Sequence, residues 1–168
     1  MAETPDATGS PANRDAADVL RLMREARFAS LATIDAETGG PYASLVNIAL
    51  LASCSPVILI SSLARHTHNL RANPAASLLI AEPSAAAGDP LASARVTLSG
   101  RFEQICDDTA AAVARNCFIA SHPAAAGYAD FRDFSWWTMS IDAAHLVAGF
   151  GRIRTIARAA LLPDAVSG

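Results

Sequence analysis

Apolar residues recur near the start of the chain with two different spacings. Between Asp15 and Arg27 they fall three or four positions apart, which is the spacing of one face of an amphipathic helix. From Phe28 the period changes, and residues 28–34 (FASLATI) are typical of a strand. The turn residues DAETGG follow directly. The pattern therefore predicts a helix over 15–27, a strand over 28–34 and a tight turn after it.

The other apolar segments are short and are separated by turn residues. We predict further strands over residues 42–51, 57–61, 76–82, 95–105, 134–141 and 145–150. A short helix is expected within 62–73, where Pro74 ends it, and another over 107–120. Gly100 marks a β-bulge in the strand that contains it. The tail to Gly168 has no clear pattern.

Many short strands with few helices between them favour an antiparallel sheet over parallel βαβ units. We therefore predict a mainly β fold with attached helices (α+β), in which an antiparallel barrel is the central element. Residues 1–13 are small and polar and contain proline, so we expect a disordered lead-in. Residues 14–168 are then a single domain, as the length of the chain suggests.

The composition is apolar, with 52% hydrophobic and 17% charged residues and a mean hydropathy of +0.27. The strongest apolar run, 45–51, is much shorter than the roughly 20 residues that span a bilayer, so no membrane association is expected. The first residues lack the basic start and apolar core of a secretory signal, so we expect a cytoplasmic protein. With only 6% aromatic residues, part of the apolar surface is expected to be covered by a partner subunit or a flat cofactor.

All 13 basic residues are arginine, and the absence of lysine excludes a Walker-type phosphate loop and Schiff-base catalysis. The net charge of -3 without a basic block argues against a nucleic-acid partner. The three cysteines are widely spaced, which is typical of neither a disulfide framework nor a zinc site. Neither a G-x-S-x-G nor a G-x-G-x-x-G motif is present, and the four histidines have no metal-site spacing, so we expect no metal centre.

Two segments are candidates for ligand binding. In residues 61–69 (SSLARHTHN), two hydroxyls precede a helix start whose backbone N–H groups attract anions, and Arg65 adds a planar donor fork that matches a phosphate. A polar turn whose serines cap the helix explains this pattern equally well. Residues 42–47 (YASLVN) form a strand with small side chains, along which a flat heteroaromatic ring can lie. An ordinary half-buried strand is the simpler interpretation of that segment.

Four segments together resemble a known family over residues 16–152. They read FASLATIDAETGGPYASLVNIAL, ILISSLARHTHNLRANPAASLLIAE, GDPLASARVTLSGRFE and YADFRDFSWWTMSIDAAHLVAGFG. The sequence resembles the pyridoxamine 5'-phosphate oxidase-related, FMN-binding split-barrel superfamily, and within it the branch that includes haem-utilisation proteins.

The resemblance implies a six-stranded antiparallel split barrel that forms a homodimer, with FMN bound at the interface. Carried over by position, the residues that border the isoalloxazine ring are Ser44, Leu45, Val46 and Asn47. Those that hold the ribityl phosphate are Ser61, Ser62, Arg65, His66 and Asn69, with Thr67 nearby. Trp136 or Phe150 of a second subunit is expected to close over the ring.

Two departures from the family pattern bear on function. The C-terminal segment GFGRIRTIARAALLPDAVSG lacks the arginine–histidine substrate motif of true pyridoxamine phosphate oxidases, so pyridoxal phosphate synthesis is not expected. No histidine follows His145, where haem-degrading relatives carry an iron ligand, although Asp133 falls where that branch has an acidic residue. We therefore predict an FMN-dependent oxidoreductase acting on an unidentified small-molecule substrate. The alternatives are a haem-binding or haem-degrading protein that uses the same cleft, and a non-catalytic flavin carrier.

Overall fold

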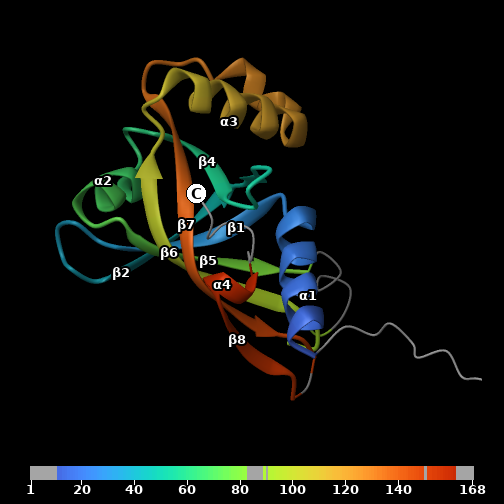
Figure 1. The fold of residues 1–168 in the computed structure, drawn as a ribbon. Helices are drawn as coiled ribbons and strands as arrows, with labels where there is room; N and C mark the ends of the chain where they lie inside the picture. The colour runs from blue at the N-terminus through green and yellow to red at the C-terminus, as the bar shows by residue number, and fades with distance from the viewer. Residues whose placement is uncertain (1–10, 83–88, 90, 150, 162–168) are drawn as a thin grey trace, which may run out of the picture.

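One antiparallel sheet, curled into a half-barrel, forms the centre of the molecule (Figure 1). The computed structural model describes residues 11–82, 89, 91–149 and 151–161. Its strands are β1 (Phe28–Ile34), β2 (Pro41–Asn47), β3 (Ala49–Leu50), β4 (Pro56–Ser61), β5 (Ala75–Ala81), β6 (Arg95–Gln104), β7 (Phe134–Val147) and β8 (Ile153–Ala157). Its helices are α1 (Pro11–Glu25), α2 (Arg65–Ala72), α3 (Asp108–Ser121) and α4 (Arg158–Leu161), with a 3-10 helix, η2, at Pro123–Gly127.

The strand order is β2-β1-β5-β6-β7-β4-β3, with β8 added beside β7, and every pair is antiparallel. The predicted mainly antiparallel fold with attached helices is confirmed. The strand count is eight in the described residues, where the resemblance implied six. The difference comes from the two-residue strand β3 and from β8, which lies in the tail without a clear pattern.

Three predicted boundaries were wrong. The strand expected over 42–51 breaks at Ile48, because residues 41–47 pair with β1 whereas Ala49 and Leu50 pair with β4. The two strands expected over 134–150 are one strand, β7, because residues 143–147 pair with β6 on one side and β8 on the other. Helix α1 begins at Pro11, so the end of the predicted disordered lead-in is helical, while residues 1–10 lie outside the described part.

The core lies between the inner face of the sheet and helix α1, whose Val19, Leu22 and Met23 are fully buried there. A second apolar cluster lies under α3, around Phe118 and Trp136. The predicted bulge at Gly100 is confirmed, because the β6–β7 register shifts between Ser99 and Gly100.

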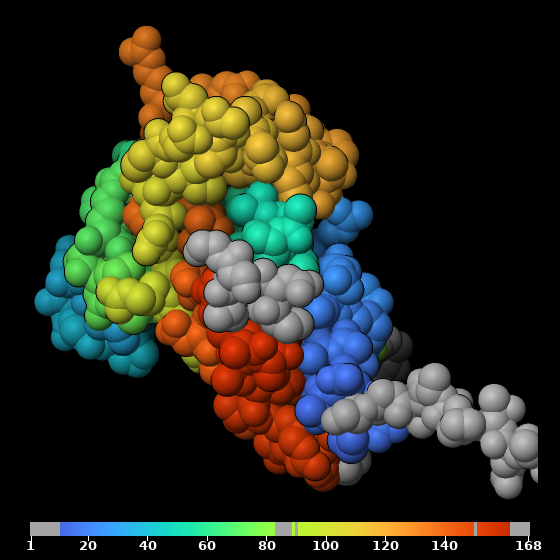
Figure 2. Space-filling view, in the orientation of Figure 1, coloured from blue at the N-terminus to red at the C-terminus, as the bar shows by residue number. Residues whose placement is uncertain are grey.

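The C-terminal segment β8–α4 lies beside α1 on the molecular surface (Figure 2). The Arg152 guanidinium joins the two, since its Nε donates to Asp15 at 2.9 Å and its terminal nitrogen donates to Asp18 at 2.7 Å. Within the described residues, we find no helix with the length and apolar character that crossing a bilayer requires.

Candidate functional site

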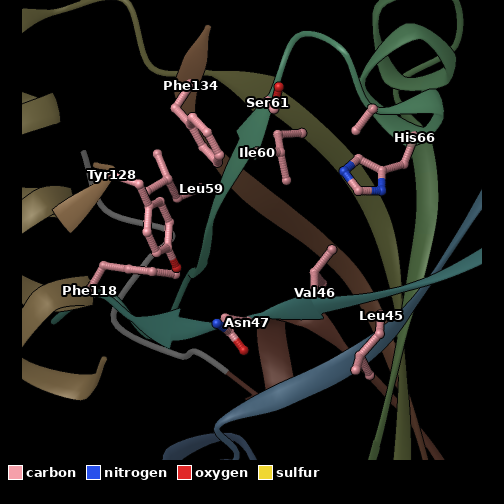
Figure 3. A pocket seen from close by; sticks show the side chains of 11 residues that line it. Leu45, Val46, Asn47, Leu59, Ile60, Ser61, His66, Phe118, Tyr128 and Phe134 are labelled. Atoms are coloured by element: carbon pink, nitrogen blue, oxygen red, sulfur yellow. The ribbon is translucent and has the colours of Figure 1, made fainter. Parts of the chain in front are cut away.

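A largely apolar pocket of about 380 Å³ opens between strands β2 and β4, the start of α2 and the segment that includes α3 (Figure 3). It is lined by Leu45, Val46, Asn47, Leu59, Ile60, Ser61, Ala64, His66, Phe118, Tyr128 and Phe134. One wall carries the three aromatic side chains, and the imidazole of His66 projects from α2 on the opposite side (Figure 3). An apolar cavity with few polar groups is typical of a site for a small molecule or cofactor.

Ring contacts hold the aromatic wall in place. Tyr128 and Phe134 pack with their ring centroids 5.3 Å apart, and Phe118 makes an edge-to-face contact with Trp136 at 5.4 Å. Trp136 was expected to reach a second subunit's ligand, but it is only 9% exposed and lies in the core behind this wall. Phe150, the other residue expected to close over the ring, lies outside the described residues.

His66 supplies the imidazole that lines the pocket. Its Nδ1 lies 3.0 Å from the hydroxyl oxygen of Ser44 on β2. Burial lowers the pKa of the His66 imidazole below its ordinary value, so the ring is neutral at pH 7. In the tautomer that donates Nδ1–H to Ser44, Nε2 carries the lone pair and faces the pocket (Figure 3).

At the end of β4, Ser61 is bonded to the protein itself. Its hydroxyl donates to Oδ2 of Asp133 at 2.6 Å and accepts from the N–H of Leu63 at 3.1 Å. The N–H of Ser62 donates to the carbonyl oxygen of Asp133 at 2.6 Å. The N-cap residue of α2 is Ala64, so neither serine is the N-cap that the alternative interpretation required.

Arg65 is also paired within the chain. Its Nε donates to Oδ2 of Asp35 at 2.6 Å, and its guanidinium lies 5.3 Å from the ring centroid of Tyr42. The other carboxylate oxygen of Asp35 accepts from the N–H and the hydroxyl of Thr38 at 3.0 and 2.9 Å. The hydrogen bond from Arg65 holds the pKa of Asp35 far below its ordinary value, so this carboxylate is charged.

Thr67 and Asn69 are buried and fix α2 against the sheet. The Thr67 hydroxyl donates to the carbonyl oxygen of Ser61 at 2.6 Å. The Asn69 amide donates to the hydroxyl of Thr33 at 3.0 Å and accepts from the N–H of Ala36 at 2.9 Å. These contacts set where the start of the helix lies, and with it the position of the His66 imidazole.

The sequence-predicted site residues therefore separate into two groups at two pockets, while Ser62 and Thr67 line neither pocket. Those that the structure brings to the pocket are Leu45, Val46, Asn47, Ser61 and His66, with Ser44 in contact with His66. The predicted phosphate-binding residues Arg65 and Asn69 instead line a second pocket of about 340 Å³, beside Asp35 and His68. The sequence analysis did not predict the aromatic wall or the role of Asp35. The aromatic residues clustered at 128–137 could have indicated the wall, whereas Asp35 was recognised only as part of a turn.

Comparison with known proteins agrees with this architecture. The model of the CREG β-barrel family matches residues 11–162. The chain is 39% identical over 112 residues to the non-canonical heme oxygenase HOZ of Arabidopsis thaliana chloroplasts, an alignment that covers 66% of this chain and 33% of that protein. The structure of a heme-binding protein from Mycobacterium smegmatis superposes with a TM-score of 0.81 at 35% identity, covering 93% of this chain and 62% of the other. The match thus spans about one third of the length of the Arabidopsis protein and somewhat under two thirds of the length of the Mycobacterium protein.

A more distant structure identifies the type of barrel. A pyridoxinephosphate oxidase-family protein from Clostridium acetobutylicum, related to general stress protein 26, superposes with a TM-score of 0.66 at 12% identity. The match covers 89% of this chain and 98% of that one, and at this identity it speaks for the fold alone. The half-barrel is therefore a split barrel of the pyridoxamine phosphate oxidase type, as the sequence resemblance implied. Since the family model extends over nearly all of the described chain, the protein belongs to the CREG β-barrel family.

Proposed function

We propose that this protein binds haem in the pocket between β2, β4 and α2, with His66 as the ligand to the iron. The observation that carries the proposal is the neutral imidazole of His66, which is bonded to Ser44 through Nδ1 and lines an otherwise apolar and aromatic cavity. The names of the relatives from Arabidopsis thaliana and Mycobacterium smegmatis, a heme oxygenase and a heme-binding protein, support the same cofactor.

The residues present fit such a group. Histidines that bind a metal through one ring nitrogen usually hydrogen-bond through the other, which fixes the orientation of the ring. Ser44 fills this role here, and the aromatic wall offers flat apolar surface to a planar macrocycle. When bound, haem would supply an iron centre that accepts ligands and electrons, while His66 would hold the iron and the apolar lining would pack against the macrocycle.

The other histidines are less suited to this role. His122 uses its Nε2 in a contact of 2.8 Å with the carbonyl oxygen of Ile48, and His68 is exposed on α2. His145 is exposed on β7, where its Nδ1 lies 3.0 Å from the hydroxyl of Thr155. In the described part of the chain, none of these three lines the pocket.

We also propose that the protein is a homodimer and that the partner completes the haem site. The outer face of β2, β1 and β5 carries no charged side chain, and it exposes Phe28, Leu45 and Leu79 by 61, 69 and 44%. Leu45 belongs both to this face and to the rim of the pocket. A second copy seated on this apolar face would cover the open side of the pocket, as a planar cofactor larger than the cavity requires.

A flavin is the second candidate for the ligand of this pocket. With a flavin bound, the protein would be the oxidoreductase expected from the sequence or a non-catalytic flavin carrier. The observation that favours it is that Leu45, Val46 and Asn47 of β2 line the pocket, as the flavin prediction requires of the strand beside the ring.

Titrating the purified protein with hemin, FMN and riboflavin separates the candidates. We expect a Soret band that saturates at one haem per chain, together with weaker binding of both flavins. Saturable FMN binding by a protein that leaves hemin unbound would favour the flavin candidate and contradict the haem proposal.

A further inference from the structure

We infer that Asp35 and Asp133 make the start of α2 select against phosphate, so that the pocket between β2, β4 and α2 does not prefer FMN over riboflavin. This inference concerns the donors at the helix start, and it is independent of whether haem binds beside His66. Two carboxylates lie within hydrogen-bonding distance of the two side chains that a phosphate would otherwise engage, Arg65 and Ser61.

The first carboxylate, Asp35, forms an ion pair with Arg65. The Asp35 side chain is only 4% exposed, whereas that of Arg65 is 51% exposed, so the anion is fixed and the cation is the more mobile partner. Thr38 donates two hydrogen bonds to Asp35, which keep the carboxylate in place when a ligand approaches. A phosphate beside Arg65 therefore meets a nearly neutral pair instead of a free guanidinium.

The second carboxylate, Asp133, accepts the hydrogen bond that the Ser61 hydroxyl donates. A serine hydroxyl has one proton to donate, and here it points to Oδ2 of Asp133 at 2.6 Å. Ser61 then has only oxygen lone pairs left to face a phosphate, and the negatively charged carboxylate of Asp133 is bonded to the same hydroxyl. Two further donors of this segment are also engaged, since the N–H of Ser62 bonds to the Asp133 carbonyl oxygen and the Thr67 hydroxyl bonds to that of Ser61.

FMN and riboflavin provide the matched pair of probes because they share the ring and the ribityl chain and differ only in the phosphate. A charge-assisted hydrogen bond changes affinity by about tenfold to hundredfold. Asp35→Asn removes the negative charge beside Arg65, and Asp133→Ala removes a negative charge and also frees the Ser61 hydroxyl to donate to a phosphate. The affinity for FMN should then rise by about tenfold or more, while the affinity for riboflavin stays the same.

The experiment measures the dissociation constants of FMN and riboflavin by flavin fluorescence for four proteins. They are the wild type, Asp35→Asn, Asp133→Ala and the control Asp130→Ala, whose exposed carboxylate pairs with Arg115 on α3. We expect the wild type and the control to bind FMN no more tightly than riboflavin, and both test variants to gain affinity for FMN alone. If Asp35→Asn does not fold because Asp35 is buried, the Asp133→Ala variant tests the inference by itself. Asp133 lies in the loop before β7, where we expect a substitution to disturb folding less.

Two results would overturn the inference. The first is a wild type that binds FMN at least tenfold more tightly than riboflavin. The second is a folded Asp133→Ala variant, with circular dichroism and thermal unfolding like the wild type, that gains no affinity for FMN. The hemin titration of the wild type is a separate readout, so a failure of the haem proposal leaves this test intact.

Discussion

Nδ1 of His66 lies 3.0 Å from the hydroxyl oxygen of Ser44, and this contact joins helix α2 to strand β2 at the edge of the pocket. The two residues are far apart in the sequence, and the curvature of the sheet brings them together. Because one ring nitrogen is bonded to β2, the other faces the cavity (Figure 3). The orientation of the proposed iron ligand therefore depends on a single hydroxyl.

Replacing Ser44 by alanine removes the hydrogen bond that orients the imidazole. We expect Ser44→Ala to weaken hemin binding by about tenfold, because loss of such an outer contact typically lowers metal affinity by about 10–100-fold. Ser53→Ala in the turn before β4 is the control, since Ser53 is exposed, does not line the pocket and lies outside the proposed dimer face. Equal hemin affinity of wild type and Ser44→Ala would show that the contact does not position the ligand.

The affinity for hemin should depend on pH through His66. Burial lowers the pKa of the imidazole below its ordinary value, so the ring keeps its lone pair available to lower pH than a free imidazole does. We expect the highest hemin affinity at neutral and mildly alkaline pH, and a loss as the pH falls through the lowered pKa. The same shift makes the unfolded chain bind the proton more readily, so stability also decreases in this acid range. Thermal unfolding recorded at each pH separates the two effects, and affinity that rises toward acid pH would contradict this role of His66.

Gly100 should not tolerate a side chain. A Cβ at this position would overlap the backbone carbonyl oxygen of Ser140 on β7, where the bulge brings the two strands together. We expect Gly100→Ala to lower the free energy of unfolding by about 1–3 kcal/mol, as overpacking commonly does. Gly127→Ala is the control, since a Cβ there would meet no atom within 4 Å. Urea unfolding of both variants measures the difference, and equal stabilities would show that the two strands are more loosely packed at the bulge.

Charge placed on the outer face of the sheet should separate the proposed dimer. Leu79 is 44% exposed on β5, away from the pocket, and an arginine there would have to be buried without a partner in the interface. We expect sedimentation to show a dimer for the wild type at micromolar concentration and a monomer for Leu79→Arg. Leu91→Arg, which replaces an exposed leucine outside the strands, should remain dimeric. A monomeric wild type would remove the proposed partner from the site.

Local sequence patterns predicted the structural features that depend only on residues close together in the chain. The spacing of Val19, Leu22 and Met23 identified the buried face of α1, and Gly100 identified the bulge. β7 was predicted as two strands because the small residues 142–144 interrupt the apolar pattern. Its pairing with strands on both sides, β6 and β8, overrides that local signal.

The candidate site was predictable only in part, because its contacts join distant segments. The segment 61–69 was recognised as polar and placed at a helix start, and His66, which was expected to hold a phosphate, lines the pocket. The pairing of Arg65 with Asp35 spans 30 positions, and that of Ser61 with Asp133 spans 72. Sequence alone showed the donors and the acidic position of Asp133, but not that the barrel brings Asp35 and Asp133 to these donors.

The most direct test of the haem proposal compares two histidines of the same helix. His66 lines the pocket, whereas His68 is exposed on α2 and does not. Hemin titrations followed at the Soret band should show near wild-type affinity for His68→Ala and a loss of at least tenfold for His66→Ala. A changed Soret position in any complex that His66→Ala still forms would report the lost ligand. Unchanged affinity and an unchanged spectrum for His66→Ala would contradict the assignment of this pocket as the haem site.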